Sequence, residues 1–385
     1  MKHPCILLML CGSALFASPR LEAAEVSIIE SCVVNDTVPN AQTPFGLVRA
    51  GDSLLAVFSD GGDLQPGAKA YLIRSDDLGK SWGEPYMVLS SEEPHMGIGG
   101  AMVSLPDDKI LLIRIEMSHH SNDRTWDAVF KGRTCVYQLE TSVDGGKTFQ
   151  KGGTLPSAPN STGGIMGTIV TLANGDLILP AYQYPHAGKE PGQEYGSGFF
   201  RSKDKGVTWG PLEVAFTDPV PGRDKKLDFN EAAYVVRPDG SIVAYARIDS
   251  EILEEGIWQS KGNHMWWAES KDNGETWSMP QETPIGGIFP ALIRVGQDKY
   301  LLACGDRHAG RKVSLYTSPN GLDFKYAIDA PYVRTKGVSI STATGGSQCF
   351  VPISENEVYM IYYAADPAEK TLDNTYIEGC LISVN

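Results

Sequence analysis

The chain has 385 residues, a formal net charge of −14 at pH 7 and a sequence pI of about 5.0. This acidic balance argues against nucleic acid as the partner, whereas local arginines can still oppose the overall field and bind a small anionic ligand. The length suits two average domains or one large all-β domain.

The first two dozen residues predict a cleaved secretory signal. Lys2 and His3 precede an apolar run from Cys5 to Ala17, and small residues follow it. The run is too short to span a bilayer, and no later segment approaches the required length. We therefore expect a signal peptide at residues 1–24, one mature domain at residues 25–385 without a membrane span, and a secreted or periplasmic protein.

The cysteines predict neither a disulfide framework nor a metal site. Of the 7 in the chain, two lie in the leader, and the remaining set is odd and sparse: Cys32, Cys135, Cys304, Cys349 and Cys380. The sequence contains no Cys-x-x-Cys and no His/Cys cluster with the spacing of zinc ligands. We expect no metal and no cofactor.

In chain order, a hydrophobic strand, a turn rich in Gly, Asp or Asn, and a second hydrophobic strand recur along the chain. The copies read "GLVRAGDSLLAVF" from Gly46, "AMVSLPDDKILLIRI" from Ala101, "TIVTLANGDLILPAY" from Thr168, "AYVVRPDGSIVAYAR" from Ala233, "ALIRVGQDKYLLACG" from Ala291 and "CFVPISENEVYMIYY" from Cys349. Their spacing of roughly 55 to 67 residues is too long for a short solenoid repeat and suits four-stranded blades. The pattern predicts an all-β fold, a six-bladed β-propeller of antiparallel blades.

A third strand in the first five copies runs into a recurring turn. It reads "RSDDLGKSW" from Arg74, "TSVDGGKTF" from Thr141, "RSKDKGVTW" from Arg201, "ESKDNGETW" from Glu269 and, in a decayed form, "TSPNGLDF" from Thr317. A calcium-binding EF-hand would need a twelve-residue loop closed by Glu and flanked by helices. Here an aromatic closes the motif and the flanks alternate like strands. We therefore predict a structural turn that is capped by Asp and opened by Gly at a positive φ.

The sixth copy has no such turn and ends with "YIEGCLISV" from Tyr376, so it lacks a fourth strand. The N-terminal "EVSIIESCVV" from Glu25 is available to supply that strand, and closing the ring in this way protects the edges of the terminal blade. Cys32 and Cys380 would then lie on adjacent strands. Either a disulfide or two unpaired buried thiols fits this arrangement.

Antiparallel strands put the recurring turns at one end of each blade, and the start of strand one and the end of strand two at the other end. At that other end we expect polar side chains to converge around the axis, unless they are only the polar loop ends that every protein has. The candidates after second strands are Asp60, Asp63, His119, His120, Tyr184, Arg247, Arg307 and Arg311, and those before first strands are His95, Glu231 and Gln348.

With these motifs the chain resembles the bacterial exo-sialidase superfamily, which consists of six-bladed propellers that carry the same turns, known as Asp-box turns. The segment "FNEAAYVVRPDGSIVAYARID" is similar to the family segment in which a Glu precedes one strand and an Arg ends the next. The resemblance implies that Glu231 polarises the nucleophile and that Arg247 helps to hold the substrate carboxylate. In "GDRHAGRKVSLYTS", either Arg307 or Arg311 fits the next family arginine, and Asp60 or Asp63 fits the acid/base aspartate.

The chain departs from the family at two positions. Thr43 stands near the place of the family's first arginine, in "QTPFGLV". The family's tyrosine nucleophile should open the sixth unit, where this chain reads "TATGGSQCF", so that Gly346, Ser347 or Gln348 takes its place.

Glycoside hydrolysis can proceed without that tyrosine, because an inverting glycosidase needs only a general acid, a general base and room for water. The polar segment from Arg114 to Arg133 offers His119 and His120, and a neighbouring carboxylate can tune a histidine to act as a base. The same segment can also be read as a solvated loop.

We expect a secreted glycoside hydrolase that releases a terminal acidic sugar from glycans, with sialic acid as the leading candidate. The catalytic candidates are Asp60, Asp63, His119, His120 and Glu231. The substrate-binding candidates are Arg247, Arg307, Arg311, His95, Tyr184 and Gln348, since guanidinium groups bind a carboxylate bidentately. The partner would be a sialylated glycan or another acidic oligosaccharide. Two alternatives stay open: a propeller glycosidase that acts on another sugar, and a non-catalytic carbohydrate-binding propeller.

Overall fold

The computed structural model describes residues 24–61, 68–90, 95–106, 109–119, 133–155, 161–165, 167–185, 196–218, 227, 229–248, 251–254, 257–260, 264–305, 312–334, 346–365 and 375–385. These residues form strands and turns and contain no helix, so none of them forms a helix that could cross a membrane. The all-β prediction is confirmed.

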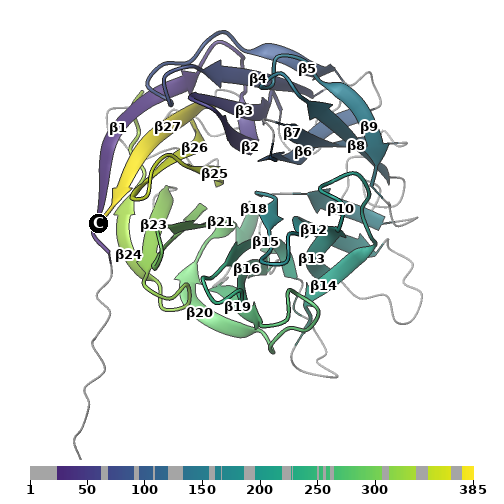
Figure 1. The fold of residues 1–385 in the computed structure, drawn as a ribbon, viewed down its shortest axis with the longest axis vertical. Helices are drawn as coiled ribbons and strands as arrows, with labels where there is room; N and C mark the ends of the chain where they lie inside the picture. The colour runs from purple at the N-terminus through teal and green to yellow at the C-terminus, as the bar shows by residue number, and fades with distance from the viewer. Residues whose placement is uncertain are drawn as a thin grey trace, which may run out of the picture.

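Six antiparallel blades are arranged in a ring around a central axis (Figure 1). The first three blades consist of β2 (Gln42–Ala50), β3 (Ser53–Ser59), β4 (Lys69–Ser75) and β5 (Tyr86–Ser90); β6 (His95–Ser104), β7 (Ile110–His119), β8 (Arg133–Ser142) and β9 (Gln150–Thr154); and β10 (Ser161–Ile165) with β11 (Val170–Thr171), β12 (Leu177–Pro185), β13 (Gly196–Ser202) and β14 (Leu212–Phe216). The last three consist of β15 (Phe229–Val236), β16 (Ile242–Ile248), β19 (His264–Ser270) and β20 (Gln281–Gly286); β21 (Ile288–Val295), β22 (Lys299–Gly305), β23 (Val313–Ser318) and β24 (Lys325–Asp329); and β25 (Gly346–Pro352), β26 (Glu357–Ala365) and β27 (Thr375–Val384) with β1 (Val26–Asn35). The predicted six-bladed propeller is confirmed.

An additional two-stranded hairpin follows β16, and the repeat pattern of the sequence did not predict it. It consists of β17 (Glu251–Glu254) and β18 (Ile257–Ser260), which pair with each other and not with a blade. Figure 1 shows β18 near the centre of the ring.

The N-terminal strand closes the ring, as predicted, because β1 pairs with β27 as the outermost strand of the last blade. This pairing also decides between the two states of the thiols. Cys32 lies opposite Gly379, while Ser31 lies opposite Cys380. Directly opposed residues share a face of a sheet and successive residues alternate between faces, so the two cysteines lie on opposite faces. They are free thiols.

Hydrophobic packing is concentrated between neighbouring blades. The buried apolar residues of the described chain form six clusters, and each joins two adjacent blades around the ring. Second strands such as β3 and β16 are buried along their whole length because a blade covers each face. This explains why their sequences read as continuous apolar runs instead of alternating patterns.

The Asp-box turns lie between the third and fourth strands of their blades, as predicted. In the first, the Ser75 hydroxyl donates to Asp77 at 2.8 Å and accepts from the Gly79 amide at 2.8 Å. Asp77 accepts from both the amide and the hydroxyl of Ser81, at 2.9 and 2.6 Å. These bonds stabilise the ionised carboxylate and lower the pKa of Asp77 to about 2. The carboxylate is occupied by its own turn, which supports a structural role.

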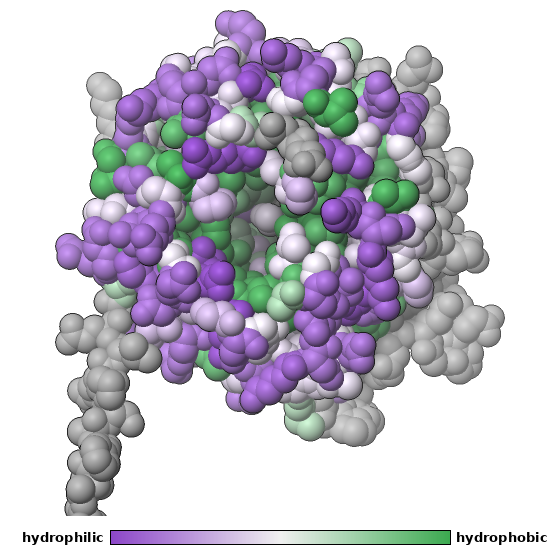
Figure 2. All heavy atoms as spheres, viewed as in Figure 1, coloured by the Kyte–Doolittle hydropathy of each residue, from purple (hydrophilic) through white to green (hydrophobic). Residues whose placement is uncertain are grey.

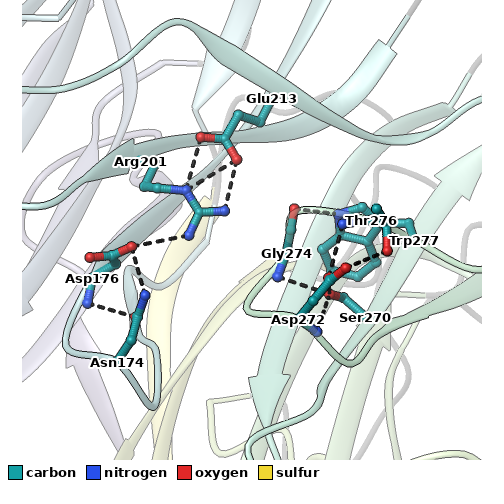
Figure 3. A network of polar contacts seen from close by, with 9 residues as sticks. All are labelled: Asn174, Asp176, Arg201, Glu213, Ser270, Asp272, Gly274, Thr276 and Trp277. Atoms are coloured by element: carbon teal, nitrogen blue, oxygen red, sulfur yellow. Dashed lines mark hydrogen bonds and ion pairs between the residues drawn. The ribbon is translucent and has the colours of Figure 1, made fainter.

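The glycines of these turns mark the points where one blade docks on the preceding one. A Cβ added at Gly79 would lie 2.2 Å from the Tyr359 ring of the last blade, and one added at Gly146 would lie 2.0 Å from Leu55 of the first blade. Both glycines have a positive φ. Figure 3 shows the turn around Asp272 beside the Arg201 network of the preceding blade.

Candidate functional site

The end of the ring opposite the Asp-box turns is shaped by irregular first strands. Five first strands carry a bulge near this end, and the first strand of the third blade is instead divided into β10 and β11. The register shifts fall between Gln42 and Gly46, Gly97 and Gly100, Phe229 and Ala232, Ile288 and Ala291, and Gly346 and Cys349. A bulge redirects side chains and is common beside active sites.

Three of these bulges contain residues that bear on the candidate site: Glu231, Phe289 and Gln348 lie in consecutive blades. Viewed along its axis, the ring is hollowed at the centre and rimmed by hydrophilic residues (Figure 2). The three bulges occupy equivalent positions of neighbouring blades around this axis, and the candidate site is built from them.

Arg247 and Glu231 form a buried ion pair in the fourth blade. Arg247 follows directly after Ala246 on β16, and Ala246 lies opposite Ala232, the residue after Glu231. The Nη1 atom of Arg247 lies 3.2 and 3.1 Å from the two carboxylate oxygens of Glu231, and both side chains are 6% exposed. The structure thus brings together two of the predicted site residues.

The geometry of this pair differs from that of two other arginines. Arg114 binds Glu140 as a fork, with Nε at 3.1 Å and Nη2 at 2.6 Å. Arg201 binds Glu213 through the same Nε and Nη2 edge, as Figure 3 shows. The fork is the stronger and more directional arrangement. Glu231 instead meets Arg247 at one terminal nitrogen, Nη1.

Phe289 of the fifth blade lies against the same guanidinium group. The Arg247 Cζ atom is 5.8 Å from the centre of the Phe289 ring, within cation–π range. Phe289 has a φ of 50°, in the left-handed region that a bulky residue avoids, at a cost of roughly 1–3 kcal/mol. Backbone strain of this kind persists where the surroundings impose it, and it clusters at functional sites.

Gln348 is buried, at 4% exposure, and is turned toward the fifth blade. Its amide nitrogen donates to the carbonyl oxygens of Phe289 and, at 2.9 Å, of Ala303. Its Oε1 atom is buried without a hydrogen-bond partner. That Gln348 contacts substrate stays a prediction.

Asp60, one of the predicted proton carriers, is engaged by its own strand pair. Its carboxylate accepts from the Lys69 amide at 2.6 Å and from the Tyr71 hydroxyl at 3.2 Å. These bonds join the end of β3 to the start of β4. The alternative candidate, Asp63, lies outside the described residues.

The remaining candidates are placed only in part. The backbones of His95, His119 and Tyr184 lie at the expected ends of β6, β7 and β12, and His95 is opposite Ser118, the neighbour of His119. Nothing is described of their side chains. His120, Arg307 and Arg311 lie outside the described residues.

Tyr362 of the sixth blade is a candidate for a displaced nucleophile. Its hydroxyl is bonded to the Pro331 carbonyl and lies 3.4 Å from Glu378. Burial raises the pKa of Tyr362 well above its usual value, and the side chain is fully buried. A phenol in this environment cannot serve as an accessible nucleophile.

Comparison with known proteins agrees with this architecture. The family model of the BNR repeat-like domain matches residues 52–328. The chain belongs to this family. No curated protein sequence matches it.

Three solved structures illustrate the fold of the family member described here. A protein of unknown function from Dyadobacter fermentans is 19% identical, with a TM-score of 0.73 over 94% of this chain and 99% of that one. A Hadza microbial sialidase is 18% identical, with a TM-score of 0.66 over 89% of this chain and 65% of the sialidase. The Trypanosoma rangeli sialidase in complex with the inhibitor DANA is 14% identical, with a TM-score of 0.59 over 94% of this chain and 60% of that one. At these identities the likeness shows a shared propeller fold.

Proposed function

We propose that the protein is a secreted glycoside hydrolase that releases a terminal acidic sugar from glycans, with sialic acid as the leading candidate. The observation that carries this proposal is the buried Arg247–Glu231 ion pair beside Phe289 at the end opposite the Asp-box turns. We assign the Arg247 guanidinium to the carboxylate of the bound sugar, since guanidinium groups bind carboxylates, as Arg114 and Arg201 do in this protein. The sialidase fold of several structural neighbours supports the same substrate class.

The proposed reaction inverts the configuration at the anomeric carbon. The start of β25 carries Gly346, Ser347 and Gln348 where the resembling family has its tyrosine, and the described Tyr362 is buried. Water would attack directly, with Asp63 and a histidine of the His119 and His120 pair as proton carriers and Glu231 holding Arg247. Arg307 or Arg311, His95 and Tyr184 are proposed to complete the substrate contacts.

Sugar release from a sialylated oligosaccharide, with the anomer of the first product followed by NMR, tests the proposal. Arg247→Ala should slow the acidic substrate roughly 10- to 150-fold more than its neutral analogue, because a charged hydrogen bond in a dry site is lost. Arg247→Lys provides a second variant that keeps the charge and loses the fork. Equal losses on the two substrates would rule out carboxylate recognition by Arg247.

A non-catalytic carbohydrate-binding propeller is the second candidate. Its support is that Asp60 is occupied by Lys69 and Tyr71 and that Gln348 binds backbone carbonyls. Such a protein would bind the acidic sugar with the same dependence on Arg247 but would release no product. Calorimetric binding that is measured beside the release assay separates the two.

A further inference from the structure

Phe289 stands between two contacts that cross blade boundaries. On one side its ring faces the Arg247 guanidinium of the fourth blade, and on the other its carbonyl accepts the Gln348 amide of the sixth blade. These contacts therefore form a series around the axis that links three consecutive blades, from Gln348 through Phe289 and Arg247 to Glu231.

The Gln348 amide has two hydrogens, and it uses them on two carbonyls of the fifth blade. The bulge between Ile288 and Ala291 interrupts the ladder of β21 with β22 next to Phe289. A bulge leaves backbone groups without their ladder partners, and a buried carbonyl needs a donor. Gln348 bonds the carbonyl of Phe289 and also that of Ala303, which lies opposite Ala291. The side chain thus fixes the bulge in the conformation that holds Phe289 at positive φ.

Holding Phe289 in this conformation has a consequence for Arg247. Glu231 contacts the guanidinium at Nη1, and the Phe289 ring lies beside the same group. An aromatic ring beside the guanidinium restricts its orientation and excludes water from one side. The same surroundings strengthen the attraction between the guanidinium and an incoming carboxylate.

We infer that Phe289, locked by Gln348, is a positioning residue that sets the orientation of Arg247 for an acidic ligand. Phe289 acts on the ligand through Arg247. The inference rests on the proposed function for its ligand and on the contacts above for its geometry.

The first measurement does not depend on any activity. Arginine labelled with 15N gives an Nε–H signal for Arg247, which is assigned by its loss in Arg247→Lys. Phe289→Gly removes the ring and suits the positive φ, and Phe289→Leu keeps apolar bulk without a ring in case the glycine variant does not fold. Both should shift the Arg247 signal, and Gln348→Met should shift it in the same direction by a smaller amount. An unmoved signal in Phe289→Gly or Phe289→Leu would overturn the inference.

The second measurement uses calorimetry with 2-deoxy-2,3-didehydro sialic acid as the probe. Phe289→Gly and Phe289→Leu should weaken binding about 2- to 30-fold, the range expected for loss of a cation–π contact, and Phe289→Tyr should restore it. Tyr326→Leu is the matched control, because it removes a cation–π pair of similar length, between Lys312 just before β23 and Tyr326 of β24 at 5.6 Å. It should leave affinity unchanged.

The two measurements separate the failures. If the signal moves but the wild-type protein binds no acidic sugar, the proposed function fails while the positioning of Arg247 by Phe289 stands. If the wild-type protein binds and Phe289→Gly and Phe289→Leu bind equally well, Phe289 has no positioning role.

Discussion

The two ends of the propeller satisfy their polar groups differently. At the Asp-box end, Ser, Asp and Thr side chains bond to one another and to the turn backbone, as Ser270, Asp272 and Thr276 do (Figure 3). At the other end lie buried polar atoms without a partner. Such atoms belong to the described residues Asn35, Asn40, Ser197, Trp266, Gln348 and Thr375.

This difference separates the scaffold end from the end that carries the candidate site. Buried polar groups in native proteins are almost always paired, so their concentration at one end needs a cause. The Asp-box end is optimised for stability within each blade and between blades. The opposite end carries strain at Phe289, the Arg247 ion pair and unpaired buried polar atoms, and this pattern supports the proposal that a ligand binds there.

The largest expected effect breaks the docking of one Asp-box turn. Gly79→Ala should destabilise the fold by about 2–4 kcal/mol, because a Cβ would clash with the buried Tyr359 ring and φ is 94°. Gly175→Ala is the control, since its φ of 89° is similar but nothing lies within 4 Å of the added Cβ. It should lose about 1 kcal/mol. Urea unfolding of both variants measures the difference, and equal losses would refute docking of this turn on Tyr359.

How much the sequence revealed follows the same division. The blades, the closing strand at residues 25–34 and the Asp-box turns depend on local periodicity and turn chemistry, and they were predicted. The bulges at Phe289 and Gln348 were not. Pro290 in "IFPAL" is a signal that could have indicated the first, because proline within a sheet is confined to edges and bulges, whereas "GSQCF" reads as an ordinary strand. Their geometry is imposed by contacts between blades. Glu231 and Arg247 were found through the family segment, whereas the contact of Arg247 with Phe289 joins positions far apart in sequence.

A second prediction separates the ends by function. Asp77→Ala removes the acceptor of the Ser81 bonds and should cost roughly 0.5–2 kcal/mol, as the loss of other capping side chains does. Thermal unfolding should report this loss, while the binding and release constants of the folded protein stay close to those of the wild type. A variant that kept its stability but lost turnover would mean that the Asp-box end contributes to the site.

A third prediction contrasts two carboxylates through pH. Hydrogen bonds lower the pKa of Asp77, whereas burial raises the pKa of Glu378, which accepts from the Val333 and Arg334 amides at 3.0 and 2.9 Å. A carboxyl with a raised folded pKa contributes stability below its unfolded pKa of about 4.3, and this contribution is lost as pH rises through the folded value.

Glu378→Gln should therefore be more stable than the wild type at neutral pH, because the neutral amide oxygen can accept the same two backbone bonds without an ionisation cost. The advantage should shrink as pH falls and vanish below about 4.3. Melting temperatures of both proteins, measured at pH values from about 4 to about 8 so that the series covers the glutamate pKa, test this. A variant that is less stable at every pH would show that the carboxylate charge itself stabilises the turn after β24.

The smallest expected effect applies one substitution to both ends. Thr276 donates its hydroxyl to Asp272, so Thr276→Val removes a satisfied bond and should destabilise the fold by about 0.5–1.5 kcal/mol. The hydroxyl of Thr375 is buried, at 4% residue exposure, and has no partner. Thr375→Val has nearly the same shape and removes a desolvated polar group, so it should be neutral or stabilising by up to about 1 kcal/mol. Opposite signs in urea unfolding would support the division between the two ends, because the substitution is identical and only the hydrogen bonding differs. If Thr375→Val cost as much stability as Thr276→Val, the Thr375 hydroxyl would have a stabilising partner. Thr375 would then no longer count among the unpaired polar groups that distinguish the two ends.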